Sequence, residues 1–305
     1  MTTQILPCPP FQHLLVPLDG SQLAEAVLPI AGWLAAICRA RITLLHVLEH
    51  DAPETVHGEQ HLGEADEANV YLAGVVARLA AGGTPVEAHV HPNQEHDVAR
   101  AIVEHAQELH ADVIALTTHG SGGLRGFLFG SIAQQVLSAS VTPVLVARPE
   151  VKLAHSGPLL VALDGGREAE QALPAALMLA LASGVPLQLL RVVRTTGVER
   201  GPAAAVTTFM PSASAALLDI EEQEAGAYLA SLAARLPAGV TVRTTVRRGE
   251  PADEIVRVAR QTACRMLLAT THGKAGLESV FAGSVIPRVL PRLAAPLLLT
   301  RLPER

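Results

Sequence analysis

The pentapeptide Leu116-Thr117-Thr118-His119-Gly120 ends an apolar run and opens a glycine-rich loop that closes at Gly130-Ser131. A helix is expected directly after that serine. Glycines let a backbone approach an anion closely, and the free N–H groups and dipole of a helix N-terminus favour negative charge. A strand, a glycine-rich turn and a helix in this order therefore predict a phosphate-binding site.

The same passage occurs a second time. Ala269-Thr270-Thr271-His272-Gly273 opens a loop that closes at Gly283-Ser284, an offset of 153 residues. Nearer the start, the segment 15–20 reappears as 160–165 with an offset of 145, so the second copy carries extra residues, which we place between Arg194 and Ser214. Segments that repeat in the same order along a chain indicate a duplicated domain. We therefore expect two domains, residues 1–150 and 151–305, and each has a size that is common for a single domain.

Composition narrows the class of protein. Apolar residues make up 49% of the chain and aromatic residues only 3%, so the core must be aliphatic. A net charge of −6 argues against general nucleic-acid binding, and no apolar run approaches the length of a membrane span. The three cysteines show no disulfide or metal-binding spacing, and the first residues lack a signal peptide, which together favour a reducing cytoplasm. We expect no metal site, and we expect His89, His91 and His96 to form a solvated edge.

Strands alternate with helices along both halves. In the first half, strands are expected over 13–18, 41–48, 85–90, 112–117 and 143–147, with helices over 21–39 (kinked at Pro29), 64–81, 95–110 and 131–139, and a polar loop over 50–63. The second half repeats the strands near Leu159, Leu187, Val240, Met266 and Pro296. This alternation predicts right-handed βαβ units and two doubly wound α/β domains with parallel sheets. Such sheets bind ligands beyond the carboxyl ends of their strands, at the switch point.

Several polar side chains follow these strands directly. Asp19 and Asp164 each come just after a first strand, where a carboxylate either accepts from an adenine amino group or a ribose hydroxyl, or caps a turn. His119 and His272 precede loop glycines, and a role in pinning the loop by hydrogen bonds is favoured over phosphate contact. No catalytic residue is predicted, because no known nucleophile or metalloenzyme motif occurs and no acid–base pair repeats beside the loops.

With these motifs in place, the sequence resembles the universal stress protein family in its tandem form, over nearly the whole chain. The family motif is Gly-x2-Gly-x9-Gly-Ser/Thr. It maps onto Thr117, Gly120, Gly130 and Ser131 in the first half, and onto Thr270, Gly273, Gly283 and Ser284 in the second. Threonine replaces the first glycine in both copies.

The resemblance implies a five-stranded parallel sheet of order 3-2-1-4-5 in each half, of the adenine nucleotide alpha hydrolase-like type. It also implies an adenine nucleotide at the two loops. The implied binding residues are Pro17, Asp19, Val47, Leu116, Thr117, His119, Gly120, Gly130, Ser131 and Ile132, and then Ala162, Asp164, Val192, Ala269, Thr270, His272, Gly273, Gly283, Ser284 and Val285. Members commonly dimerise through the fifth strand, so the segments 143–147 and 296–300 are expected to pair within one chain as a pseudo-dimer, with a further homodimer left open.

The expected function is that of a cytoplasmic, ATP-binding stress-response sensor or regulator, with Mg²⁺ as an optional companion of the ATP and no membrane or nucleic-acid partner. Two alternatives stay open. One is a nucleotide-free tandem module that works through protein contacts at the segments 50–63 and 194–214. The other is a slow ATPase or autokinase that uses Ser131 and Ser284, for which the sequence shows no general base.

The two sites are expected to be unequal, with the first stronger. Glu278 stands where the first loop has Arg125, and Pro287 removes a backbone donor from the first turn of the second phosphate helix. Lys274 acts in the opposite direction, because it adds a cation next to Gly273.

Overall fold

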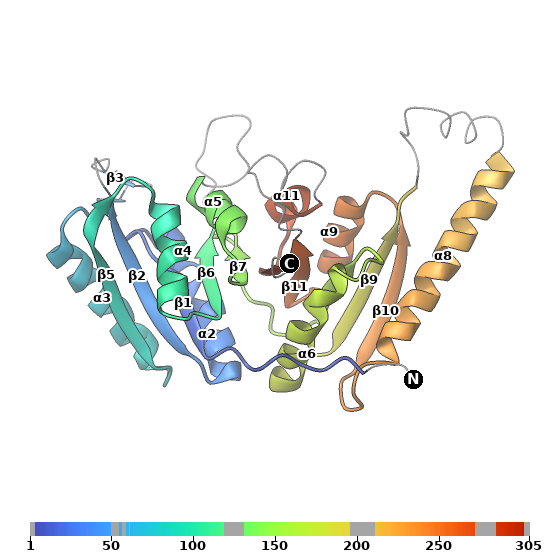
Figure 1. Cartoon of the computed structure of the whole chain (residues 1–305), viewed down its shortest axis with the longest axis horizontal. Helices are drawn as coiled ribbons and strands as arrows, with labels where there is room; N and C mark the ends of the chain where they lie inside the picture. Colours follow the sequence, from blue (N-terminus) through green and yellow to red (C-terminus); the bar gives the residue numbers. More distant parts are fainter. Residues whose placement is uncertain are drawn as a thin grey trace.

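The computed structural model describes residues 4–49, 55–56, 59–60, 62–118, 131–195, 211–271 and 285–301 (Figure 1). These residues form a ten-stranded sheet with helices on both faces, together with a small two-stranded hairpin. The two glycine-rich loops, 119–130 and 272–284, lie outside the described residues.

The first half builds one end of the sheet. Its elements are β1 (His13–Pro17), α1 (Gln22–Glu25), α2 (Leu28–Cys38), β2 (Arg41–Glu49), β3 (Thr55–Val56), β4 (Glu59–Gln60), α3 (Ala65–Ala80), β5 (Val86–Glu95), α4 (Val98–Glu108), β6 (Val113–Thr117), α5 (Ser131–Ala139) and β7 (Val144–Ala147). The order across the sheet is β5-β2-β1-β6-β7, and every pair in it is parallel. Numbered within this half, the order is 3-2-1-4-5, as predicted.

The second half repeats the arrangement. Its elements are β8 (Leu159–Leu163), η1 (Ala169–Gln171), α6 (Ala172–Ser183), β9 (Leu187–Val193), α8 (Pro211–Ala233), β10 (Val242–Arg248), α9 (Pro251–Gln261), β11 (Met266–Thr271), α11 (Ile286–Val289), η2 (Leu290–Arg292) and β12 (Leu297–Arg301). The order β10-β9-β8-β11-β12 is again 3-2-1-4-5 with parallel pairs. The predicted doubly wound fold class is therefore confirmed in both halves.

The fifth strands join the two halves into one sheet. β7 and β12 pair antiparallel, with Leu145 opposite Leu298, as the sequence predicts. Arginines at the ends of these strands reach into the opposite half: Arg301 donates to the carbonyl oxygens of Leu137 (3.3 Å) and Ser138, and Arg148 donates to that of Pro291. The two arginines, like Ser138 and Pro291, are 153 residues apart, so the contacts are pseudo-symmetric. Each arginine thus binds carbonyls at the end of the last helix of the opposite half, where carbonyls have no hydrogen-bond partner within the helix.

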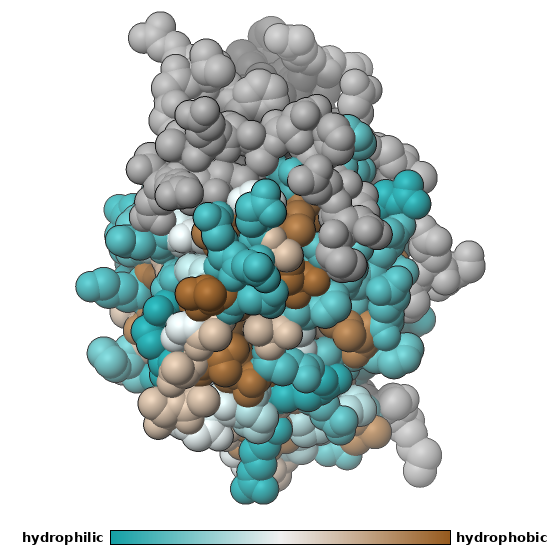
Figure 2. Space-filling model, turned by 90° about the vertical axis from the view of Figure 1, so that its left-hand side faces the viewer, coloured by the Kyte–Doolittle hydropathy of each residue, from teal (hydrophilic) through white to brown (hydrophobic). Residues whose placement is uncertain are grey.

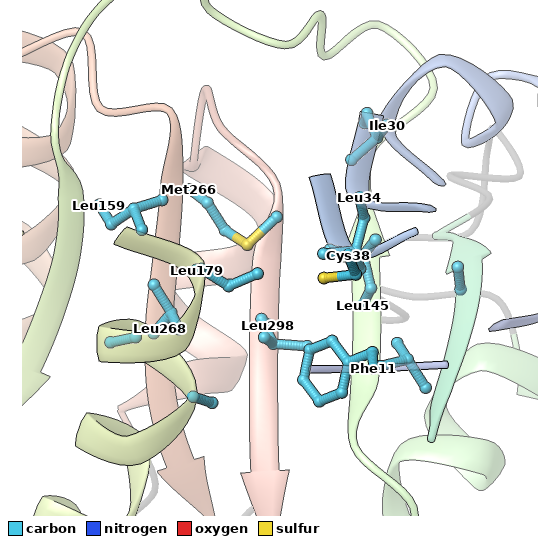
Figure 3. Close-up of a cluster of buried hydrophobic side chains, with 14 of the residues drawn as sticks. Phe11, Ile30, Leu34, Cys38, Leu145, Leu159, Leu179, Met266, Leu268 and Leu298 are labelled. Carbon is cyan, nitrogen blue, oxygen red and sulfur yellow. The ribbon is translucent and has the colours of Figure 1, made fainter. Parts of the chain in front are cut away.

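The interface extends from the sheet into the helix layer. Helices α2 and α6 lie next to each other on one face, above the joined strands, and their buried side chains form one continuous apolar cluster (Figure 3). Residues 4–12 reinforce the contact, because they run along the second half before entering β1 (Figure 1). In that segment the N–H of Ile5 donates to the carbonyl of Arg235 at 2.9 Å, and that of Cys8 to the carbonyl of Pro174 at 3.2 Å.

Three local predictions are wrong. The helix expected over 21–39 divides into α1 and α2, and Pro29 occupies the first turn of α2, where its missing N–H costs little. The polar loop expected over 50–63 contains the hairpin β3–β4. The third strand continues to Glu95, so α4 begins only at Val98, after Asp97 has capped it. The predicted cap Ser21 is confirmed, since its hydroxyl accepts from the N–H of Ala24 at 3.1 Å.

Candidate functional site

The helices that connect β1 to its two neighbouring strands lie on opposite faces of the sheet, which creates a switch point at the carboxyl end of β1. Apolar side chains of α2 and α3 pack on one face of the sheet, and those of α4 and α5 pack on the other. β1 lies between β2, which is reached across the first face, and β6, which is reached across the second. The edge between β1 and β6 is where sheets of this kind bind ligands.

The predicted residues of the first half that the structure describes gather at this edge. Pro17 ends β1, Val47 is near the end of β2, and Leu116 and Thr117 end β6. Two residues before Pro17, Val47 and Leu116, the residues Leu15, Leu45 and Ile114 pack their side chains on the α4–α5 face. Because alternate residues of a strand share a face, the three side chains line the same side of the edge. Ser131 and Ile132 open α5, which follows β6 on that side.

Asp19 and Asp164 both form the turn that follows the first strand of their half. An oxygen of the Asp19 carboxylate accepts from the N–H of Ser21 at 2.9 Å and from its hydroxyl at 2.7 Å. In the second half, the Asp164 carboxylate accepts from the N–H of Gly166 at 2.7 Å. The turn role is therefore realised in both halves, and it orients each carboxylate at the ligand edge.

The second half assembles the same face from smaller or less buried residues. Ala162, Val192 and Val285 are partly buried against the cluster that includes Ala269, on the α9–α11 face. Ile286, which the sequence analysis did not select, packs there too. The side chain of Thr270, on β11, faces the neighbouring strand β12, since its hydroxyl lies 3.1 Å from that of Thr300.

The helix that follows the fourth strand differs most between the halves. α5 has 9 residues, whereas α11 has 4 and continues into the 3-10 turn η2. Pro287 lies in the first turn of α11, as predicted, and the N–H groups of Arg288 and Val289 both bond to the carbonyl of Val285 at 3.1 Å. The N-terminus of α11 therefore offers fewer backbone donors and a smaller dipole than a helix of three turns.

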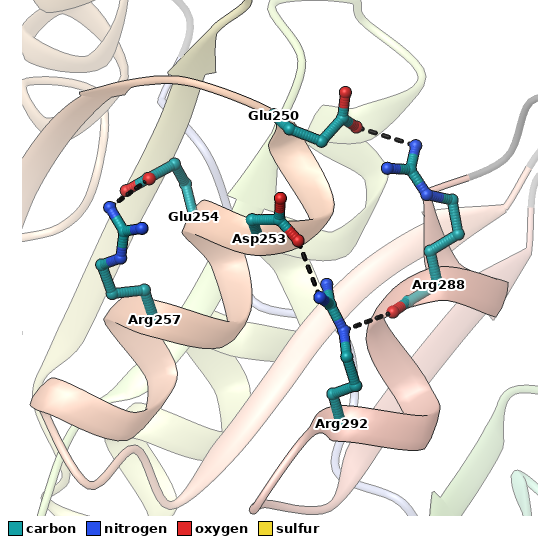
Figure 4. A network of polar contacts seen from close by, with 6 residues as sticks. All are labelled: Glu250, Asp253, Glu254, Arg257, Arg288 and Arg292. Atoms are coloured by element: carbon teal, nitrogen blue, oxygen red, sulfur yellow. Dashed lines mark hydrogen bonds and ion pairs between the residues drawn. The ribbon is translucent and has the colours of Figure 1, made fainter.

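Ion pairs hold α11 and η2 on α9 (Figure 4). Arg288 pairs with Glu250 at 2.8 Å, and Arg292 pairs with Asp253 at 2.7 Å while its Nε donates to the carbonyl of Arg288 at 3.1 Å. At the positions equivalent to the two arginines, α5 has Gln135 and Ala139. These arginines are therefore committed to neighbouring carboxylates, which leaves the short helix fixed in place.

Two residues behind the site, His46 and Arg191, occupy equivalent positions beside Val47 and Val192. His46 is buried, with Nδ1 2.8 Å from the carbonyl oxygen of Leu18 and Nε2 3.0 Å from that of Leu62, so it ties the turn after β1 to the start of α3. Its counterpart Arg191 lies over the ring of Tyr228, with Cζ 5.2 Å from the ring centroid.

Some of the predicted binding residues lie outside the described residues. His119, Gly120, Gly130, His272, Gly273, Gly283 and Ser284 belong to the two loops, and their roles stay predictions. Across the described ranges, no group of three or more His, Cys, Asp or Glu residues is arranged to hold a metal ion. In the same part of the chain, none of the helices combines the length and apolar character that crossing a membrane requires.

The fold and its repeated ligand edge define a tandem, doubly wound α/β protein. The chain belongs to the universal stress protein family, whose model matches it twice, over residues 10–148 and 156–301. It is 27% identical to a universal stress protein of Mycolicibacterium smegmatis over 299 residues, which covers 94% of this chain and 96% of that protein. A universal stress protein of Mycobacterium tuberculosis is 24% identical over 301 residues, covering 95% and 97%. The crystal structure of a universal stress protein from Archaeoglobus fulgidus superposes with a TM-score of 0.66 at 20% identity, covering 95% of this chain and 98% of that one.

Proposed function

We propose that this protein binds an adenine nucleotide, ATP, mainly in its first half, and that it acts in the cytoplasm as a stress-response sensor or regulator rather than a metabolic enzyme. Membership of the universal stress protein family supports the stress-related role. Three free thiols, Cys8, Cys38 and Cys264, agree with a reducing compartment.

The observation that carries the proposal is the build of the first ligand edge. Pro17, Val47 and Leu116 line one side of this edge with apolar side chains suited to a flat base, with Val47 and Leu116 buried, and Asp19 provides a carboxylate held by its own turn. The N-terminus of α5, at Ser131, stands on the same side of the sheet and suits phosphate oxygens. A mostly apolar platform with a few placed polar groups is the usual character of a cofactor site.

The regulatory assignment rests on how these groups are used. The Asp19 carboxylate already accepts two hydrogen bonds from Ser21, which hold it in place as an acceptor for a donor group of a ligand. The two halves share one sheet through β7 and β12, so a ligand that orders one half acts on a rigid neighbour. Because the candidate sites of the two joined halves differ, we infer a binding protein with one principal ligand site.

Calorimetric titration with ATP, with and without Mg²⁺, tests the proposal on two matched variants. Gly130→Asp and Gly283→Asp each place a carboxylate at the end of one glycine-rich loop. We expect Gly130→Asp to weaken binding about tenfold or more, equivalent to about 1.4 kcal/mol, and Gly283→Asp to change it little. Equal losses would mean that the halves bind alike, and the reverse ranking would mean that the second site is the stronger.

Two other outcomes would replace the proposal. Absence of adenine nucleotide from freshly purified, denatured protein, together with no binding in the titration, would favour a nucleotide-free module that works through protein contacts. Turnover of ATP that persists through purification and is lost in Gly130→Asp would favour a slow ATPase or autokinase.

A further inference from the structure

Three histidines that are distant in the sequence meet beside the first ligand edge. His89 and His91 lie on β5, and His105 lies on α4 and is 8% exposed. Nε2 of His105 is 3.3 Å from Nε2 of His89 and 3.2 Å from Nδ1 of His91. The expected solvated edge is therefore met in part, because His89 and His91 are half-buried on the edge strand β5 and His96 is exposed. We call His89, His91 and His105 the histidine cluster.

The hydrogen bonds of the cluster define where the protons of the neutral imidazoles lie. Nδ1 of His105 is 2.9 Å from the carbonyl oxygen of Ala101, which can only accept, so Nδ1 carries a proton. In neutral His105 the lone pair of Nε2 then faces both neighbours, and it accepts N–H groups from His89 and His91. The neutral cluster thus joins the edge strand β5 to α4.

Protonation removes this arrangement. A proton on Nε2 of His105 turns the shared acceptor into a donor, so His89 and His91 keep their contacts at 3.2–3.3 Å only by exchanging tautomers to present a lone pair. Charge on more than one ring adds repulsion between neighbouring imidazolium groups at the same short distances. The pKa of His89 is lowered, by burial first and then by His105 and His91, and it is raised to a smaller extent by Glu108 and Glu87. β2 contributes the apolar Leu45 and Val47 to this face, and the described side chains of α5 carry no charge.

The cluster adjoins the residues that we assign to the adenine side of the first site. In the β2–β5 register, Leu45 pairs with His89 and Val47 pairs with His91. Within the described part of the sheet, β5 is the outermost strand of this half and has only β2 beside it, while α3 packs on its other face with the buried Leu72 and Val75. Polar and charged residues cover most of the side of the molecule that contains β5, with apolar residues in smaller patches (Figure 2). Release of β5 from α4 would therefore loosen the outer wall of the site.

The second half provides an internal comparison. Thr245 and Arg247 pair with Leu190 and Val192, and so they stand where the first half has His89 and His91. Val258, buried at 1% exposure on α9, is equivalent to His105. The cluster is thus confined to one half, and the fold accepts valine at the position of its central residue.

We propose that the histidine cluster is a proton-sensitive contact that weakens adenine-nucleotide binding at the first site when it is protonated. This inference rests on the proposed function for its ligand. The neutral cluster keeps β5 against α4 and holds the wall beside Val47 in place. Proton uptake separates the imidazoles and releases that wall, so affinity falls as the pH falls.

Titration with ATP at about pH 8 and about pH 5.5 tests the coupling in the full chain. We expect the dissociation constant of the wild type to rise about tenfold at the lower pH. His105→Val, which copies Val258, should show a change of less than about twofold across the same range. Protonation of ATP itself affects both proteins equally. A control variant, His155→Gln at an exposed loop position, should behave like the wild type. Equal pH dependence in the wild type and His105→Val would overturn the proposal.

Amide hydrogen exchange provides a readout that needs no nucleotide. Corrected for intrinsic rates and measured in EDTA, exchange of the β5 amides should quicken at the lower pH in the wild type, but not in His105→Val. Unchanged protection of β5 would overturn the mechanism even if affinity varied with pH. If ATP failed to bind at either pH, the proposed function and the coupling would both fall, while the exchange result would still decide whether protons release β5.

Discussion

Leu298→Ala should strongly destabilise the whole molecule, because this side chain lies at the centre of the joined sheet. Leu298 is 0% exposed and stands opposite Leu145, also 0% exposed, in the only strand pair that the described part of the sheet shares between the halves. Removing a fully buried leucine side chain costs about 2–5 kcal/mol, as lost transfer energy plus the cavity. We expect about 3 kcal/mol for Leu298→Ala and a similar value for its pseudo-symmetric partner, Leu145→Ala. Since both truncations enlarge one cavity, the double variant should depart from additivity by about 0.5–3 kcal/mol.

Chemical denaturation followed by tryptophan fluorescence is suited to this test. Trp33 is the single tryptophan, on α2 of the first half, and Cζ of Arg265, from the second half, lies 5.5 Å from the centre of its ring. Its emission therefore responds when the halves part, and circular dichroism reports the loss of helices independently. Leu181→Ala, at a position 48% exposed on α6, is the control and should cost about 0.5 kcal/mol or less. If Leu298→Ala cost no more than this control, the joined sheet would not be the stabilising interface and the reasoning would fail.

Two further predictions concern other parts of the fold. Gly157→Ala should destabilise by about 2 kcal/mol or more, since Gly157 has a φ of +110° and an added Cβ would lie 2.1 Å from the carbonyl oxygen of Ala263. Gly226→Ala, within a helix and with nothing within 4 Å, should be neutral or stabilising by about 0.5–1 kcal/mol, and thermal melts that reversed the two would contradict the assigned backbone geometry. Arg301→Met should lose the charge-assisted bonds to the end of α5 and cost about 1.5–3 kcal/mol in urea unfolding. An unchanged midpoint would show that this contact between the halves contributes little.

The sign of the pH effect on stability follows from His89 of the histidine cluster and from His13 on β1. Because the pKa of His89 and that of His13 are lowered by burial, the native state keeps both neutral where the unfolded chain binds protons. Their contribution is complete above the unfolded value of about 6.5 and is lost as the pH falls below it. The chain should therefore melt at a lower temperature at acid pH, and His105→Val should reduce this dependence.

The sequence by itself was sufficient for the alternation of strands and helices and for the repeat of one fold, whereas the strand order 3-2-1-4-5 was implied by the resemblance to the universal stress protein family. Ordered repeats at offsets of 145 and 153 residues showed that one fold is built twice, and short apolar runs such as 113–116 identified strands covered on both faces. These signals are local or nearly so, and a capping serine such as Ser21 acts within its own turn. Pairing of the fifth strands was implied by the same resemblance, and it also hides two apolar edges in one chain.

Only the tertiary structure decided which distant side chains meet. His105 contacts His89 and His91 because α4 folds back over β5, a contact that the strand pattern does not contain. The reciprocal contacts of Arg148 and Arg301 exist only after the halves join, because the carbonyls that they bind belong to helix ends in the opposite half. The division of the first helix into α1 and α2 likewise depends on packing, since Pro29 permits either a kink or a new helix start. Periodicity determines which face of an element is buried, whereas the partner of a polar side chain depends on how the elements are placed against each other.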